Sequence, residues 1–295
     1  MNKLLKYKSF IKTITLVVVF TLLSLSIINN LMEITSVSSI EDKVYVPIMM
    51  YHQIKYKDLG KDVISPDEFK SDLNYLKENN YNTITMSQLI NYVYDGIDLP
   101  DNPIILSFDD GYLTTYKYVY PLLKEYDMKI VLSIVGKSTD DFTKVFDDNL
   151  NYAHLSWDQI QEMEQSGHVE IQNHTYNLHF VRNGRYGCYQ KKNESLSEYE
   201  SIITEDVNAL QSRVRDITGF EPNTFTYPYG KYNDNTESII KKLGFKATLS
   251  CTYGVNVIRV EDKDALFGLK RICRSHNQSI QKLIKGGMET LKYVE

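Results

Sequence analysis

The feature that most constrains the fold is a regular alternation of apolar, strand-like segments and amphipathic, helix-like segments after residue 43. Apolar runs of the kind found in buried strands occur at residues 44–51, 83–86, 103–108, 129–135, 169–172, 224–227 and 247–251. Such alternation is typical of a parallel sheet covered by helices, because each crossover between parallel strands needs a long connection. The sequence therefore predicts an α/β fold with a barrel-like parallel sheet of about seven strands, closed or nearly so.

Residues that cap helices mark the starts of the segments between these runs. Ser65-Pro66 places a capping serine before a proline at the first helical position. Ser87 is expected to cap the next helix, and Ser197-x-x-Glu200 predicts a capping box for a long helix that reaches residue 218. Residues 180–192 contain two glycines and show no clear period, so we expect a loop there.

The N-terminal segment has the layout of an export signal. Four lysines in the first 12 residues precede an apolar run, Ile14 to Ile28, that has no polar face. We expect residues 1–38 to be a signal peptide or signal anchor, residues 39–43 a linker, and residues 44–295 a single domain. The run is short for a spanning helix, which needs roughly 20 apolar residues. Cleavage and anchoring to the cytoplasmic membrane both stay open, and either predicts an extracellular or cell-surface protein.

The net charge restricts the class of binding partner, and the cysteine spacing restricts the kind of metal site. The formal net charge is −5, and residues 1–38 contribute four lysines and only one acidic residue, so the remaining chain is more acidic still. An acidic domain argues against nucleic acid as a partner. Cys188, Cys251 and Cys273 are widely spaced without a CxxC pattern, so we expect unpaired thiols and no thiolate metal site.

Polar side chains follow several of the predicted strands at the point where each strand ends. His52, Asp109-Asp110, His174 and Pro228-Tyr229-Gly230 all stand at such positions. In barrel-like parallel sheets the carboxyl ends of the strands meet at one end of the fold, where active sites lie. The sequence therefore predicts one site built from these four segments.

Two of these clusters have the chemistry of a catalytic metal centre. The side chains of the successive Asp109 and Asp110 diverge, so one can bind a metal while its neighbour faces a bound water. His174 and His179 would lie about 140° apart on a straight helix, whereas a strand end followed by a turn can bring them together. Two imidazoles plus one carboxylate form the ligand set of a catalytic zinc-type site with an open position for water.

Three segments resemble, in order, the first three motifs of the NodB-type polysaccharide deacetylases, carbohydrate esterase family 4. They are Ser107–Tyr112 (SFDDGY), His174–His179 (HTYNLH) and Thr226–Gly230 (TYPYG). The resemblance spans residues 44 to about 275 and implies the distorted (β/α)7-type barrel of that family, the NodB-like fold. Tyr51-His52 and the five-residue histidine spacing resemble the branch that acts on poly-N-acetylglucosamine and related polymers.

The resemblance implies a metal-dependent hydrolase that removes N-acetyl groups from an extracellular amino-sugar polymer, such as poly-N-acetylglucosamine or peptidoglycan. It implies that Asp110, His174 and His179 hold a divalent metal, with zinc favoured and cobalt, iron or nickel as alternatives. Two other readings stay open: a catalytically inactive relative that binds glycans, and an esterase that removes O-acetyl groups from another cell-surface polysaccharide.

Catalytic roles follow from the same resemblance. Asp109 would be the general base, and the backbone N–H of Tyr229, between Pro228 and Gly230, would stabilise the oxyanion. His52 is the expected general acid.

Two positions depart from the typical family pattern. His276 competes with His52 for the role of general acid, because typical members place that histidine near the C-terminus. The typical third motif also carries an arginine at the position of Thr226, and we expect Arg271 to supply the guanidinium that orients the base.

Overall fold

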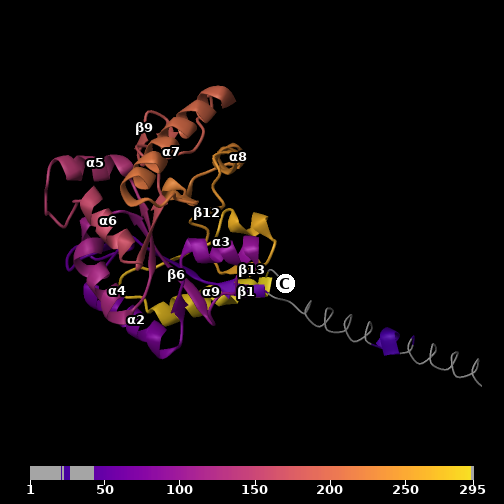
Figure 1. The fold of residues 1–295 in the computed structure, drawn as a ribbon. Coiled ribbons are helices and arrows are strands. Elements are labelled where there is room, and N and C mark those ends of the chain that lie inside the picture. The colour runs from indigo at the N-terminus through magenta and orange to yellow at the C-terminus, as the bar shows by residue number, and fades with distance from the viewer. Residues whose placement is uncertain (1–20, 22, 27–42, 294–295) are drawn as a thin grey trace, which may run out of the picture. The chain divides into compact units, whose positions relative to one another are not determined.

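A curled parallel sheet forms the centre of the protein in this computed structural model, which describes residues 21, 23–26 and 43–293 (Figure 1). From edge to edge, its strands are β12 (Ala247–Leu249), β11 (Thr224–Thr226), β8 (Val169–Asn173), β7 (Ile130–Ile134), β6 (Pro103–Asp110), β2 (Ile48–Tyr51) and β14 (Ile272–Cys273). A further strand, β5 (Asn82–Thr83), pairs with the start of β6. Leu269, just ahead of β14, forms a parallel bridge with Leu249 of β12 and so links the two edges. The predicted barrel-like α/β fold is confirmed.

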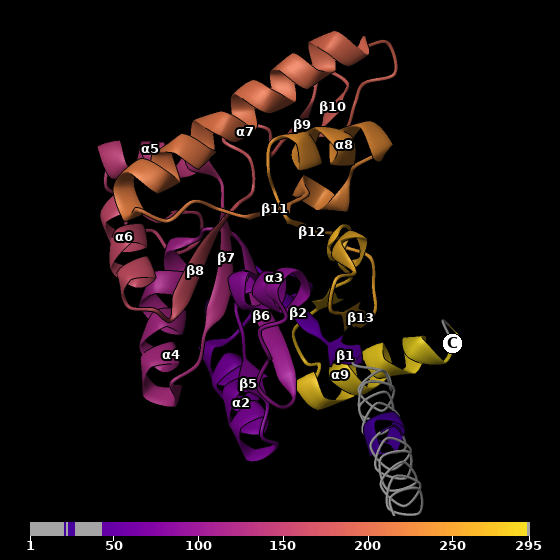
Figure 2. The ribbon, with the colours of Figure 1, turned by 45° about the vertical axis from the view of Figure 1, so that its right-hand side comes forward.

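Helices connect the strands and cover the sheet (Figure 2). They are α2 (Pro66–Glu78), α3 (Met86–Asp95), α4 (Tyr120–Tyr126), α5 (Gly136–Lys144), α6 (Trp157–Gln165), α7 (Leu196–Thr218), α8 (Asp234–Lys242) and α9 (Ile280–Glu289), with a π-helical turn at Thr115–Val119 and 3₁₀ turns at Pro228–Gly230, Lys263–Leu266 and Thr290–Tyr293. α6 and α7 pack on each other and on β8, and α2 packs against α4 and α9.

The alternation of side chains along β6 separates two hydrophobic clusters and so decides where Asp109 points. Ile104, Leu106 and Phe108 pack in the cluster that the outer helices share, whereas Ile105 packs in the cluster that contains the apolar face of α3. Asp109 therefore faces the same side of the sheet as Ile105, the side that the curl encloses, and its side chain is buried.

Shorter strands lie outside the main sheet. β1 (Lys43–Val46) pairs in antiparallel fashion with β13 (Asn256–Arg259). Pro47 separates β1 from β2, so the strand predicted at residues 44–51 is two strands. β3 (Gln53–Ile54) pairs with β4 (Val63–Ile64). β9 (Val181–Arg182) and β10 (Arg185–Tyr186) form a small hairpin, so the prediction of an irregular loop over residues 180–192 was wrong at its centre.

Two predicted helix caps were wrong by two residues. Thr85, and not Ser87, is the N-cap of α3, and its hydroxyl accepts a hydrogen bond from the backbone N–H three residues on. Ser195, and not Ser197, forms the capping box of α7. The serine–glutamate spacing of a capping box occurs at both serines, so the pattern alone could not choose between them.

The predicted signal segment, residues 1–38, lies outside the described residues apart from residues 21 and 23–26. Among the helices that are described, none has the length and apolar content needed to cross a bilayer. Residues 43–293 belong to one compact unit. All three cysteines lie within it and are free thiols.

Candidate active site

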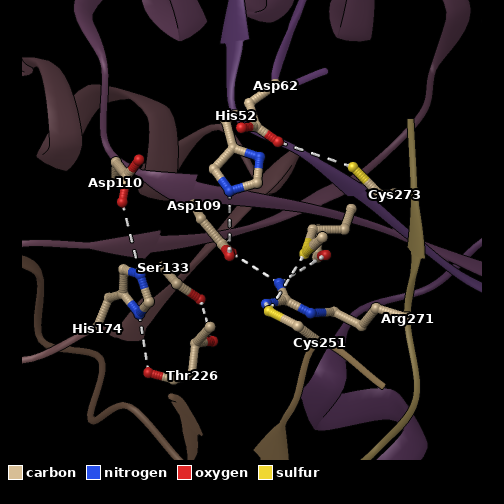
Figure 3. Close-up of polar contacts among 12 residues, drawn as sticks. His52, Asp62, Asp109, Asp110, Ser133, His174, Thr226, Cys251, Arg271 and Cys273 are labelled. Carbon is tan, nitrogen blue, oxygen red and sulfur yellow. Dashed lines mark hydrogen bonds and ion pairs between the residues drawn. The ribbon is translucent and has the colours of Figure 1, made fainter. Parts of the chain in front are cut away.

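The polar segments that follow the predicted strands meet at the carboxyl ends of the parallel strands, as expected. They surround a cavity of about 240 Å³. Its lining residues are His52, Gln53, Asp62, Val63, Asp109, Asp110, Tyr112, His174, His179, Tyr229 and Cys251. Figure 3 shows Asp109, His52 and Arg271 grouped on one side and Asp110 with His174 on the other.

Asp110, His174 and His179 form a compact cluster with the geometry of a metal site. Asp110 Oδ1 lies 3.5 Å from Nε2 of His174 and 3.3 Å from Nε2 of His179. One ligand atom from each residue lies within 4.8 Å of the other two. The turn after β8, in which Thr175 adopts a φ of +74°, brings the two imidazoles together.

Two observations support the fit of a divalent cation to this cluster. His174 Nδ1 lies 2.8 Å from the carbonyl oxygen of Thr226, an arrangement that fixes the ring and directs Nε2 toward the cluster. Within the described part of the chain, Asp110 Oδ1 is buried and has no hydrogen-bond partner. A buried carboxylate oxygen without a partner is costly unless a cation or proton satisfies it.

The protonation of His179 and Asp110 suits a cation. Burial and the charge of His174 together lower the pKa of His179 to about 4. Burial alone would raise the pKa of Asp110, but the close contact and charge of His174 outweigh it and hold that pKa well below its usual range. A neutral imidazole and an ionised carboxylate are the forms that bind metals. Burial would lower the pKa of His174, but the close contact with Asp110 and the charge of Asp109 outweigh it and raise that pKa, so a metal would have to displace a proton from this ring.

The backbone after β6 separates the two aspartates. Asp110 and Gly111 both have positive φ values, +74° and +76°. A Cβ at Gly111 would lie 3.1 Å from Cγ2 of Ile134, so glycine is needed both for the conformation and for the space. As a result Asp109 points toward Arg271 while Asp110 points toward the histidines.

Asp109 is held by a buried ion pair with Arg271. Arg271 Nη1 donates to Asp109 Oδ1 at 2.8 Å, and the two side chains are 0% and 4% exposed. The guanidinium also donates from Nε to the carbonyl of Ser250 at 2.7 Å. Burial would raise the pKa of Asp109, but the charges of Arg271 and His174 outweigh it and lower that pKa below its usual value. Asp109 is therefore an ionised carboxylate in a nearly buried position.

The two histidines that compete as general acid lie in different surroundings. His52 lines the cavity, and its Nε2 lies 4.0 Å from Asp109 Oδ2. His276 contacts Glu68, with 2.8 Å between Nδ1 and Oε2, and is absent from the described lining of the cavity. Of these two histidines, His52 is the one that lines the cavity.

The third motif forms a tight turn against the cavity. Tyr229 has a φ of +58° and lines the cavity, and its ring lies 4.5 Å from that of His179. A Cβ at Gly230 would come within 2.6 Å of Cβ of Cys251, so this turn packs directly on the segment after β12. Thr226, at the usual arginine position, instead hydrogen-bonds through its hydroxyl to Ser133 at 2.7 Å.

Five lining residues received no role from the sequence: Gln53, Asp62, Val63, Tyr112 and Cys251. Asp62 follows no predicted strand, so no pattern pointed to it. Tyr112 is part of the SFDDGY segment, and Cys251 ends a predicted strand, so the rule that strand ends carry the site could have found both.

Comparisons with known proteins agree with this geometry. The sequence model of the polysaccharide deacetylase family matches residues 96–248. The chain is 26% identical over 226 residues to the poly-beta-1,6-N-acetyl-D-glucosamine N-deacetylase of Escherichia coli K12, which covers 70% of this chain and 33% of that protein. It is 26% identical over 210 residues to the Staphylococcus epidermidis protein of the same description, covering 66% and 68%. The chain thus spans about a third of the length of the Escherichia coli relative.

Solved structures show the same fold. A de-N-acetylase from Aggregatibacter actinomycetemcomitans superposes with a TM-score of 0.71 and 26% identity, covering 83% of this chain and 100% of that one. IcaB from Ammonifex degensii gives a TM-score of 0.64 and 25% identity, covering 78% and 92%. The family match covers more than half of the chain, and the motifs that it includes converge on one cavity. The protein belongs to the polysaccharide deacetylase family.

Proposed function

We propose that this protein is a metal-dependent hydrolase that removes N-acetyl groups from an extracellular amino-sugar polymer, with poly-N-acetylglucosamine favoured over peptidoglycan. One observation carries the proposal: the Asp110, His174 and His179 cluster shares a single cavity with the ionised Asp109. The named relatives from Escherichia coli and Staphylococcus epidermidis act on poly-beta-1,6-N-acetyl-D-glucosamine, which favours that polymer.

Asp110, His174 and His179 would hold the metal, for which zinc is favoured and cobalt, iron and nickel are alternatives. When bound, the ion supplies Lewis acidity, which makes water more acidic and polarises the acetyl carbonyl. Asp109 accepts the proton of the attacking water, and Arg271 keeps this carboxylate ionised and oriented.

The remaining groups complete the hydrolysis. The backbone N–H of Tyr229 donates to the oxyanion, with Pro228 and Gly230 fixing the turn. His52 donates a proton to the departing amine, because it lines the same cavity with its Nε2 4.0 Å from Asp109 Oδ2. The products are acetate and a glucosamine unit of the polymer.

The proposed location follows from the N-terminal segment. We propose that residues 1–38 export the chain as a signal peptide or retain it as an anchor, that residues 39–43 link this segment to the enzyme, and that residues 44–295 act outside the cytoplasmic membrane. An extracellular polymer would then be accessible to the site.

The test is acetate release by the purified protein after removal of metals and reloading with zinc or cobalt. The substrates are β-1,6-linked N-acetylglucosamine oligomers, purified peptidoglycan and an O-acetylated polysaccharide. Asp109→Asn should keep the metal and lose turnover, whereas Asp98→Asn, at an exposed aspartate outside the site, should keep both.

Each alternative reading gives a different result. Metal-dependent release from amino-sugar polymers, lost in Asp109→Asn, supports the proposal. Polymer binding without release would indicate a glycan-binding relative. Release from the O-acetylated substrate alone would indicate an esterase.

A further inference from the structure

A row of aromatic rings leads from the metal-site cluster to the protein surface. The ring of His179 lies 4.5 Å from that of Tyr229, and the ring of Tyr229 lies 5.0 Å from that of Tyr186. Tyr229 is 39% exposed and Tyr186 is 40% exposed. The outer two rings therefore form an open aromatic surface that begins at the wall of the active-site cavity.

Tyr186 is presented by a hairpin strand, and the residues directly before and after it are buried. Arg185, its neighbour, is buried and forms an ion pair with the half-buried Glu194. On the other side, Cys188 is fully buried, and its carbonyl accepts a hydrogen bond from Tyr199 at 2.7 Å. These contacts fix the backbone on both sides of Tyr186 without using its side chain.

The same hairpin is seated directly on the third motif. A Cβ at Gly187 would lie 3.0 Å from Cβ of Pro228 and 3.3 Å from Cδ2 of Tyr229. Gly187 also has a positive φ, +57°, so the close approach depends on glycine. The position of Tyr186 relative to the catalytic turn is thus set by backbone packing.

The exposed side chain of Tyr186 does not pack in the hydrophobic core, and its chemistry is suited to binding a sugar ring. Tyrosine offers an apolar face and a hydroxyl at low cost in conformational entropy, and the faces of sugar rings are apolar with hydroxyls at their edges. Lys231 Nζ lies 5.8 Å from the centre of the Tyr186 ring and adds a donor at its border.

We propose that Tyr186 and Tyr229 form a subsite for the sugar unit next to the one that is deacetylated. The subsite makes the enzyme select polymer over single sugars. This inference rests on the proposed function, because it takes the substrate to be an amino-sugar polymer that enters the cavity beside Tyr229.

The first test compares kcat/KM of wild type, Tyr186→Ala and Tyr186→Phe on a β-1,6-linked N-acetylglucosamine pentamer and on the monosaccharide. Tyr186→Ala should lower the ratio of the two kcat/KM values about tenfold, the scale of one aromatic contact, through a higher KM for the pentamer. Tyr186→Phe should keep most of the wild-type ratio of the two kcat/KM values. Tyr189→Ala is the matched control, because Tyr189 is 42% exposed in the same segment.

Zinc affinity distinguishes a sugar subsite from a structural role of Tyr186. If the loss of Tyr186 displaced Tyr229, the neighbouring His179 would be disturbed and zinc would bind more weakly. Tyr186→Ala should bind zinc as wild type does. An unchanged kcat/KM ratio in Tyr186→Ala, or the same loss in Tyr189→Ala, would overturn the subsite.

A second test does not depend on turnover. Pentamer binding is measured by calorimetry in the Asp109→Asn protein with and without Tyr186→Ala. The subsite predicts about tenfold weaker binding when Tyr186 is lost, and equal binding refutes it. If wild type releases no acetate from any substrate, the proposed function fails, while this binding comparison still decides the subsite.

Discussion

Replacing Arg271 with methionine should destabilise the protein strongly and abolish turnover, because it leaves the buried carboxylate of Asp109 without its guanidinium partner. The pair is joined at 2.8 Å and both side chains are almost fully buried, so solvent screens it little. Removing one partner of such a pair costs roughly 3–5 kcal/mol. For a domain of this size that loss corresponds to a Tm lower by about 10 °C.

The assay is urea unfolding at pH 7 of wild type, Arg271→Met, Asp109→Asn and the double variant. A chelator is present throughout, because metal bound only to the folded state would add stability by mass action. If the loss comes from the orphaned carboxylate, Asp109→Asn should return roughly 2 kcal/mol or more in the Arg271→Met background.

Arg274 provides the matched control. It is also buried, and it donates to Asp72 at 2.8 and 3.0 Å, in a pair separate from Asp109. Arg274→Met should cost a similar amount, but adding Asp109→Asn there should cause a further loss and no recovery. Recovery of equal size in both backgrounds, or none with Arg271→Met, would refute the assigned pairing.

Three further predictions concern the histidines and the response to acid. His52→Ala should lower kcat for acetate release by about 10²–10⁴-fold while His276→Ala stays near wild type, and equal losses would contradict the choice of His52. His179→Ala should weaken zinc binding roughly a hundredfold with little change in fold, since one of three protein ligands is lost; calorimetric zinc titration and circular dichroism check this. Burial raises the pKa of Glu68, but the hydrogen bond from the backbone N–H of Ser65 and that with His276 outweigh it and hold the pKa at about 2 against an ordinary 4.5. A carboxylate with a depressed pKa stabilises the fold at pH values above its pKa in the unfolded state. This stability is lost as the pH falls from 4.5 toward 2. The Tm of wild type should therefore drop more steeply over that interval than the Tm of Glu68→Gln, and parallel curves would contradict the assignment.

The sequence predicted the parallel sheet and most of the cavity because their signals are local. The SFDDGY segment and the histidine pair each follow an apolar run, and parallel strands bring such ends together without further information. Arg271 was expected from the resemblance and contacts Asp109, although 162 positions separate them.

Elements without local periodicity could not be predicted. The hairpin strands β9 and β10 are two residues each, too short to show alternation. The adjoining Gly187 packs on Pro228, a residue distant in sequence. The pairing of β1 with β13 joins residues more than 200 positions apart. Asp62 reaches the cavity from a loop, and loop paths follow from tertiary packing and not from sequence pattern.

The distance along the chain between Asp109 and Arg271 also sets an order of assembly during synthesis. The three residues of the metal cluster have all left the ribosome once residue 179 has, whereas β14 and Arg271 come about 90 positions later. A nascent or C-terminally truncated chain can therefore possess every ligand proposed for the ion and still lack the guanidinium that pairs with Asp109, the proposed base. Competence to bind metal would then precede competence to hydrolyse, which needs Arg271 of the later segment as well.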